Sequence, residues 1–182
     1  MSNNSVNSTT TTILVDKECT QLQSQEVLYK EEMYFCLFVC TFIVWLKFLV
    51  TTMILAYKSG KTRNRTKEDL KKEDEENDII PIEAKESEQR WWYIELNDLE
   101  NFPFHLILFW GAGIVSNSNS SRLSIIVLFP SYIILRLLHT ISFGMANFPL
   151  RVISFTLCLL CMIYVGVLGS LDSYAAIRKN KI

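Results

Sequence analysis

Four long windows of the sequence are almost free of charged side chains, and this feature constrains the fold most strongly. The windows cover residues 33–57, 96–115, 123–146 and 149–171. A hydrocarbon core about 30 Å thick requires roughly 20 mostly apolar residues in an α-helix, so each window can cross a bilayer. The windows are about twice as long as a barrel strand and lack its alternation of apolar and polar residues. They predict an all-α membrane protein whose domain, residues 33–172, is a four-helix transmembrane bundle.

The charged residues gather between the first two windows, in the segment 58–90. This segment holds 9 of the 18 basic and 10 of the 19 acidic side chains. Five basic residues follow the first span directly: Lys58, Lys61, Arg63, Arg65 and Lys67. Because Lys and Arg keep their flank of a span in the cytosol, we predict a cytosolic loop and two luminal termini. The polar segment 1–32 is predicted to be a disordered luminal tail, and 173–182 a short basic tail.

Composition excludes several other classes of protein. A net charge of −1 provides no positive field for nucleic acid, so no nucleic-acid partner is expected. The five cysteines follow no secreted disulfide framework, and Cys158 and Cys161 lie inside an apolar span, where thiols usually pack. The two histidines, His105 and His139, have no carboxylates or thiols around them at metal-ligand spacing, and we predict no metal site.

Ionisable side chains occur inside the predicted spans, where each costs at least a few kcal/mol. Lys47 stands alone in the first span. Glu100, which shares a predicted helix face with Asn97, Asn101 and His105, lies in the second span. Arg136, His139 and Arg151 lie in the third and fourth.

These polar positions allow two interpretations. In the first, they pair with one another and only set the helix register. In the second, they line a polar pocket at the cytosolic end of the bundle. Two arginines in such a pocket suit a small ligand that carries carboxylates, and Glu100 suits an ammonium group on it. An arginine beside a thiol also favours the thiolate, which is the nucleophilic form.

Two blocks of sequence, LNDLENFPF and RLLHTISFGMANFPLRVISF, carry a resemblance to a known family. They resemble the membrane-associated eicosanoid and glutathione metabolism (MAPEG) family, in particular its branch of microsomal glutathione transferase 1 and microsomal prostaglandin E synthase. The likeness covers roughly residues 33–171. It implies a homotrimer of four-helix subunits, with glutathione bound between adjacent subunits near the cytosolic face. It also implies lipophilic electrophiles or lipid peroxides that arrive through the bilayer.

The resemblance assigns roles to particular residues. It implies that Arg151 activates the thiol of glutathione. It implies glutathione binding by five further residues: Asn97, Glu100, Arg136, His139 and Arg90.

The sequence also departs from the family pattern at several site positions. Tyr93 stands where the family has a glutathione-binding arginine, and Ser59 stands at a basic position that Lys58 and Lys61 flank. Phe143 replaces a tyrosine, so its hydroxyl is lost.

Two functional hypotheses follow. The favoured one is a membrane-bound glutathione S-transferase or glutathione peroxidase that acts on lipophilic electrophiles or lipid hydroperoxides. The alternative is a catalytically inactive homologue that acts as a lipid-binding or scaffold protein. The expected location is the endoplasmic reticulum membrane, with the outer mitochondrial membrane as the second choice. An unrelated four-span channel or adaptor is the third reading, and it would form no trimer.

Overall fold

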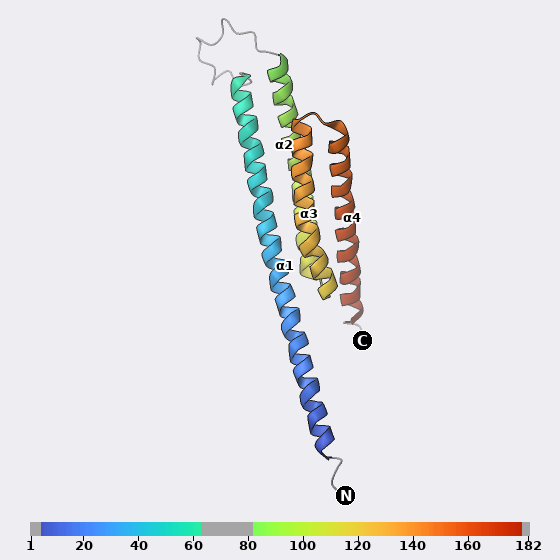
Figure 1. Cartoon of the computed structure of the whole chain (residues 1–182). Coiled ribbons are helices and arrows are strands. Elements are labelled where there is room, and N and C mark those ends of the chain that lie inside the picture. Colours follow the sequence, from blue (N-terminus) through green and yellow to red (C-terminus); the bar gives the residue numbers. More distant parts are fainter. Residues whose placement is uncertain (1–4, 63–81, 180–182) are drawn as a thin grey trace.

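The computed structural model describes residues 5–62 and 82–179, and their regular structure is four α-helices (Figure 1). The helices are α1 (Ser5–Lys61), α2 (Ile82–Val115), α3 (Asn119–Gly144) and α4 (Phe148–Lys179). The predicted all-α fold with four helices is therefore confirmed. The middle of the predicted charged loop, residues 63–81, lies outside the described residues.

Three of the described helices are long and apolar enough to cross a membrane: the part of α1 from Gln23 to Lys61, α3 and α4. The predicted second span lies in α2, which runs beside the other helices in Figure 1. The second half of this predicted span is apolar, whereas Asn97, Asp98 and Glu100 make the first half of the span polar. The crossing of the membrane by α2 therefore stays a prediction.

The boundaries of regular structure differ from the sequence prediction at three places. Helix α1 begins at Ser5, so most of the segment 1–32 is helical where we predicted a disordered tail. This segment contains no glycine or proline, and extending an existing helix costs far less than starting one. Likewise α1 runs to Lys61 and α2 begins at Ile82, which shortens the predicted loop at both ends. Helix α4 continues to Lys179 and includes most of the predicted basic tail.

The core of the bundle lies where α2 and α3 meet the other two helices. Helix α1 packs against α2 and α3, and so does α4. An aromatic stack occupies the centre, with the rings of Phe109 and Phe129 4.1 Å apart and Tyr132 beside them. The outer faces carry exposed large apolar side chains, as expected for surfaces that face lipid.

Small residues let the helices approach closely. A Cβ atom on Gly113 of α2 would lie only 2.7 Å from Cδ1 of Leu37 in α1. A Cβ atom on Gly169 of α4 would lie 3.2 Å from Cβ of Ala112 in α2. Gly111 has nothing within 4 Å of its own Cβ position. Gly113 and Gly169 thus set the helix spacing, as small residues do in membrane bundles.

The turn between α3 and α4 has a defined backbone conformation that reverses the direction of the chain. Ala146 has φ of 55°, a left-handed conformation that L-residues rarely adopt. Its N–H donates to the Phe143 carbonyl at 3.1 Å, and the N–H of Asn147 donates to the Ser142 carbonyl at 2.8 Å. These two bonds are the Schellman pattern, in which the left-handed position is usually glycine. Asn147 then caps α4, because its Oδ1 accepts from the N–H of Leu150 at 3.3 Å.

Candidate functional site

An ion pair joins α1 to α2 inside the bundle. Lys47 Nζ donates to Asp98 Oδ2, and the two side chains are 8% and 2% exposed. The Lys47 ammonium also lies 4.9 Å from the centre of the Phe102 ring. Lys47 is the only charged residue of its own span, but it is paired with Asp98 of α2, which the sequence analysis did not single out. Spacing along α2 could have found Asp98, because Ile94, Asp98 and Phe102 are four residues apart and share its buried face.

A second polar cluster surrounds Arg136 of α3, which is 2% exposed. Its Nη1 donates to Asn97 Oδ1 of α2 at 2.9 Å, and its Nε donates to the Tyr132 hydroxyl at 3.1 Å. The same hydroxyl lies 2.5 Å from Nδ1 of His105. The guanidinium carbon lies 5.0 Å from the centre of the Phe102 ring, the ring that Lys47 also approaches. The first predicted interpretation therefore holds for Arg136, which pairs with a residue of a neighbouring helix.

The bond from Arg136 determines which end of the Asn97 amide faces outward. A guanidinium has only donors, so the carbonyl oxygen of Asn97 must face it. The amide nitrogen of Asn97 then faces away, and no hydrogen bond occupies it in the described part of the chain. Asn97 is half-buried, so the site presents a hydrogen-bond donor here.

The predicted shared face of α2 does not form. His105 points into the bundle toward Tyr132, whereas Glu100 is exposed on the outside. The two residues are five positions apart, which places their side chains about 140° apart around the α-helix. Asn101 turns its amide back to the Asn97 carbonyl at 2.7 Å. Among the described residues no ion pair or hydrogen bond joins Glu100 to an arginine.

Arg151 is half-buried in the first turn of α4. Its guanidinium carbon lies 4.6 Å from the centre of the Phe143 ring and 5.2 Å from that of Phe148. Within the described residues no hydrogen bond or ion pair involves its guanidinium. His139, which is 5% exposed, lies behind Phe143 at a ring distance of 6.1 Å. The Phe143 ring is thus near both the His139 ring and the Arg151 guanidinium.

Polar contacts continue along α1 and α2 toward the predicted cytosolic loop. Ser59 donates to Glu88 at 2.5 Å, and Lys58 Nζ donates to the Ser87 hydroxyl at 2.7 Å. Thr52 donates to Glu95 at 2.8 Å. Ser59 stands where the family pattern has a basic residue, and Lys58 precedes it. Both side chains bond to α2, so Lys58 is held at the α1–α2 interface.

Arg90, the last of the predicted glutathione contacts, and Tyr93 lie in α2 one to two turns before Asn97. Arg90 is half-buried, and Tyr93 is 47% exposed. The Tyr93 hydroxyl accepts from Gln89 Nε2 at 3.3 Å. Tyr93 therefore brings a weak polar group where the family pattern has a charged one.

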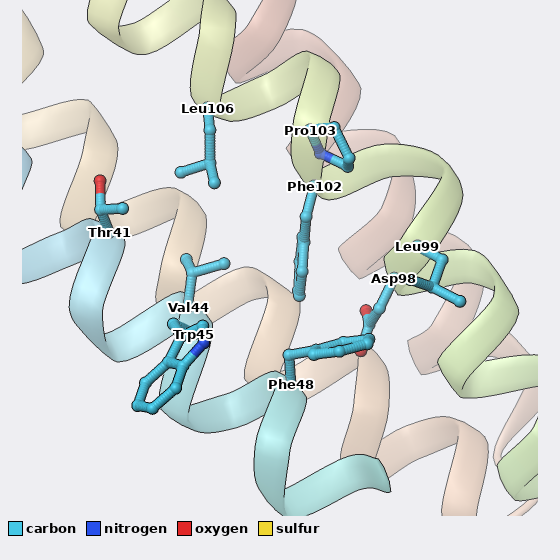
Figure 2. A pocket seen from close by; sticks show the side chains of 9 residues that line it. All are labelled: Thr41, Val44, Trp45, Phe48, Asp98, Leu99, Phe102, Pro103 and Leu106. Atoms are coloured by element: carbon cyan, nitrogen blue, oxygen red, sulfur yellow. The ribbon is translucent and has the colours of Figure 1, made fainter.

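A groove of about 350 Å³ opens between α1 and α2 (Figure 2). Helix α1 contributes Thr41, Val44, Trp45 and Phe48; α2 contributes Asp98, Leu99, Phe102, Pro103 and Leu106. Because proline has no N–H, the carbonyl four residues before Pro103 lacks its usual helical donor. The walls are largely apolar, and Asp98 is the one charged residue among those that line the groove, so the groove suits an apolar chain.

In the part of the chain that the structure describes, no three His, Cys, Asp or Glu side chains gather as a metal site would require. Cys158 is 1% exposed and belongs to the apolar core.

The fold and this polar interior define a multi-pass membrane protein with charged groups inside a four-helix bundle. The model of the MAPEG family matches residues 34–170, which is most of the chain, so the protein belongs to the MAPEG family. This family generally includes glutathione-dependent membrane enzymes. No curated protein matches the chain.

Proposed function

We propose that the protein is a membrane-bound glutathione S-transferase or glutathione peroxidase of the branch that contains microsomal glutathione transferase 1 and microsomal prostaglandin E synthase. Its substrates are lipophilic electrophiles or lipid hydroperoxides. The observation that supports this most is the state of Arg151. Its guanidinium is half-buried, and no carboxylate of the described residues neutralises it. A cation held in this way is available to an anionic ligand.

Glutathione supplies the reactive sulfur, so the protein needs no nucleophile of its own. Arg151 stabilises the thiolate, because guanidinium stays charged when partly desolvated. The free amide nitrogen of Asn97 donates to a carboxylate or peptide oxygen of glutathione. Glu100 accepts from the ammonium group of the same molecule.

The structure suggests a changed role for two of the residues expected to contact glutathione. Arg136 and His139 are 2% and 5% exposed, too buried to be reached by a peptide-sized ligand without rearrangement. Arg136 acts by holding Asn97 in place through its Nη1. Arg90, half-buried on α2, remains a contact residue in this proposal.

The proposed site is completed by a second copy of the chain in a homotrimer. Glu100 is exposed on α2 and Arg151 lies on α4, and the described chain contains no contact that joins them. A site between adjacent subunits, as the resemblance implies, brings such residues together from two chains. The α1–α2 groove offers the lipophilic substrate an entry from the bilayer. We place the protein in the endoplasmic reticulum membrane, with the outer mitochondrial membrane as the alternative and the loop that follows α1 in the cytosol.

The experiment is glutathione binding to the full-length protein in detergent, followed by thiolate absorbance and by conjugation of a chloronitrobenzene. We expect a thiolate signal in the wild type that disappears in Arg151→Ala. Arg178→Ala is the matched control, because Arg178 is exposed at the other end of α4. Equal turnover in Arg151→Ala and the wild type would contradict the assignment.

A second candidate function is the inactive homologue that binds lipid or acts as a scaffold. The exposed Tyr93, which replaces a charged residue of the family pattern, favours it. The loss of one charge-assisted hydrogen bond weakens binding by about tenfold to a hundredfold. If a trimeric wild-type protein fails to bind millimolar glutathione, this function replaces the enzyme, and Tyr93→Arg is the reversion to test.

A further inference from the structure

We propose that Phe143 and Phe148 are positioning residues that hold Arg151 against two aromatic rings and so keep its charge and donors free for the thiolate. This inference rests on the proposed function. It concerns how Arg151 is positioned in a chain that has Phe143 where the family pattern has a tyrosine.

The two rings approach Arg151 from different helices. Phe143 lies in the last turn of α3, and Phe148 is the first residue of α4. Their ring centres lie 4.6 and 5.2 Å from the guanidinium carbon of Arg151. Both distances fall within the range of about 6 Å over which a cation is attracted to an aromatic face.

The turn between the helices fixes this arrangement. The N–H of Ala146 donates to the carbonyl of Phe143 itself, and the left-handed backbone of Ala146 reverses the chain within a few residues. The N–H of Arg151 donates to the carbonyl of Asn147 at 3.2 Å, which places the arginine one turn into α4. The turn thus places the rings of Phe143 and Phe148 near the Arg151 guanidinium.

A third ring supports Phe143 from within the bundle. The His139 ring lies 6.1 Å from that of Phe143 and 5.9 Å from that of Phe155 in α4. His139 is buried and one turn before Phe143 on α3. Phe143 is therefore in contact with both a buried ring and the guanidinium.

Aromatic rings hold an arginine in a way that a carboxylate cannot. A carboxylate would take two of the five N–H donors and cancel the charge, whereas a ring contacts the guanidinium without using its N–H groups as hydrogen-bond donors. Within the described residues no ion pair engages Arg151. The clamp therefore positions a cation that keeps its full capacity to bind an anion. The ring of Phe143 provides this, and a hydroxyl on it is not required.

The test uses the full-length protein in detergent with glutathione as the probe, and compares Phe143→Leu, Phe143→Tyr and Phe148→Leu. Phe148 is 64% exposed, so its replacement should not disturb folding. Phe38→Leu is the matched control, because Phe38 is 70% exposed on α1 and distant in sequence from the turn. Thiolate absorbance is measured against pH, and kcat is separated from the KM for glutathione.

We expect Phe143→Leu to lower thiolate formation and kcat by about tenfold, and Phe148→Leu by a smaller factor, as the strength of cation–π contacts suggests. Phe143→Tyr keeps the ring and should lie within about threefold of the wild type. The KM for glutathione should change less than kcat, because the tripeptide backbone is bound by other residues.

Three outcomes would overturn the inference. If both leucine variants keep the wild-type thiolate curve, the rings do not position Arg151. If Phe143→Tyr loses as much as Phe143→Leu, the ring is not what matters. If the wild type itself shows no thiolate, the proposed function fails, and the role of the rings fails with it.

Discussion

The Lys47–Asp98 pair offers the sharpest test of how this bundle is held together. Both side chains are at least nine-tenths buried, and each is the other's ionic partner. Removing one partner of a buried pair leaves a charge without compensation and costs about 3–5 kcal/mol. We therefore expect Lys47→Met and Asp98→Asn each to lower the free energy of unfolding by that amount.

The double variant should behave differently from the sum of the two. Lys47→Met with Asp98→Asn removes both charges of the pair together, so it should be more stable than either single variant. The assay is reversible unfolding in mixed micelles, followed by circular dichroism. Lys30→Met is the control, because Lys30 is exposed and its loss should change stability by no more than about 0.5 kcal/mol. If the double variant loses as much as the two single losses together, the pair is not coupled and the reasoning is refuted.

Three further predictions address the packing, the turn and the topology. Gly113→Val should destabilise the protein by about 1–3 kcal/mol because its side chain meets Leu37, while Gly111→Val should be nearly neutral; equal melting temperatures would contradict the close α1–α2 contact. Ala146→Gly should stabilise the protein by about 1 kcal/mol, because glycine adopts the left-handed conformation without strain, and an unchanged or lower melting temperature would count against it. Residues 7–9 are Asn-Ser-Thr, an N-glycosylation acceptor that lies in the lumen if the loop after α1 is cytosolic. Expression in microsomes should therefore add a glycan to the wild type and none to Asn7→Gln. A wild-type protein with the same gel mobility as Asn7→Gln would contradict the predicted orientation.

The helical character of the chain could be predicted from the sequence, because a membrane span requires a long, uninterrupted window of apolar residues that is visible in the sequence itself. A backbone in hydrocarbon must satisfy its own hydrogen bonds, so a long apolar window is a helix wherever it packs. The blocks around Asn97, Arg136 and Arg151 carried the resemblance to the MAPEG family, and the family match over residues 34–170 agrees with it. Local pattern failed at the first 32 residues, where the helix of the first span continues outward through a polar sequence.

The partners of the polar residues were decided only by the tertiary structure. Lys47 and Asp98 are 51 positions apart, and Arg136 and Asn97 are 39 apart. Periodicity places side chains on a face of one helix, but it does not tell how that helix is rotated against its neighbours. That rotation turns Asp98 inward, where it forms an ion pair, and leaves Glu100 exposed on the outside of the bundle. The clamp on Arg151 likewise depends on the reversal of the chain at Ala146, because only that turn brings Phe143 of α3 onto the guanidinium in α4.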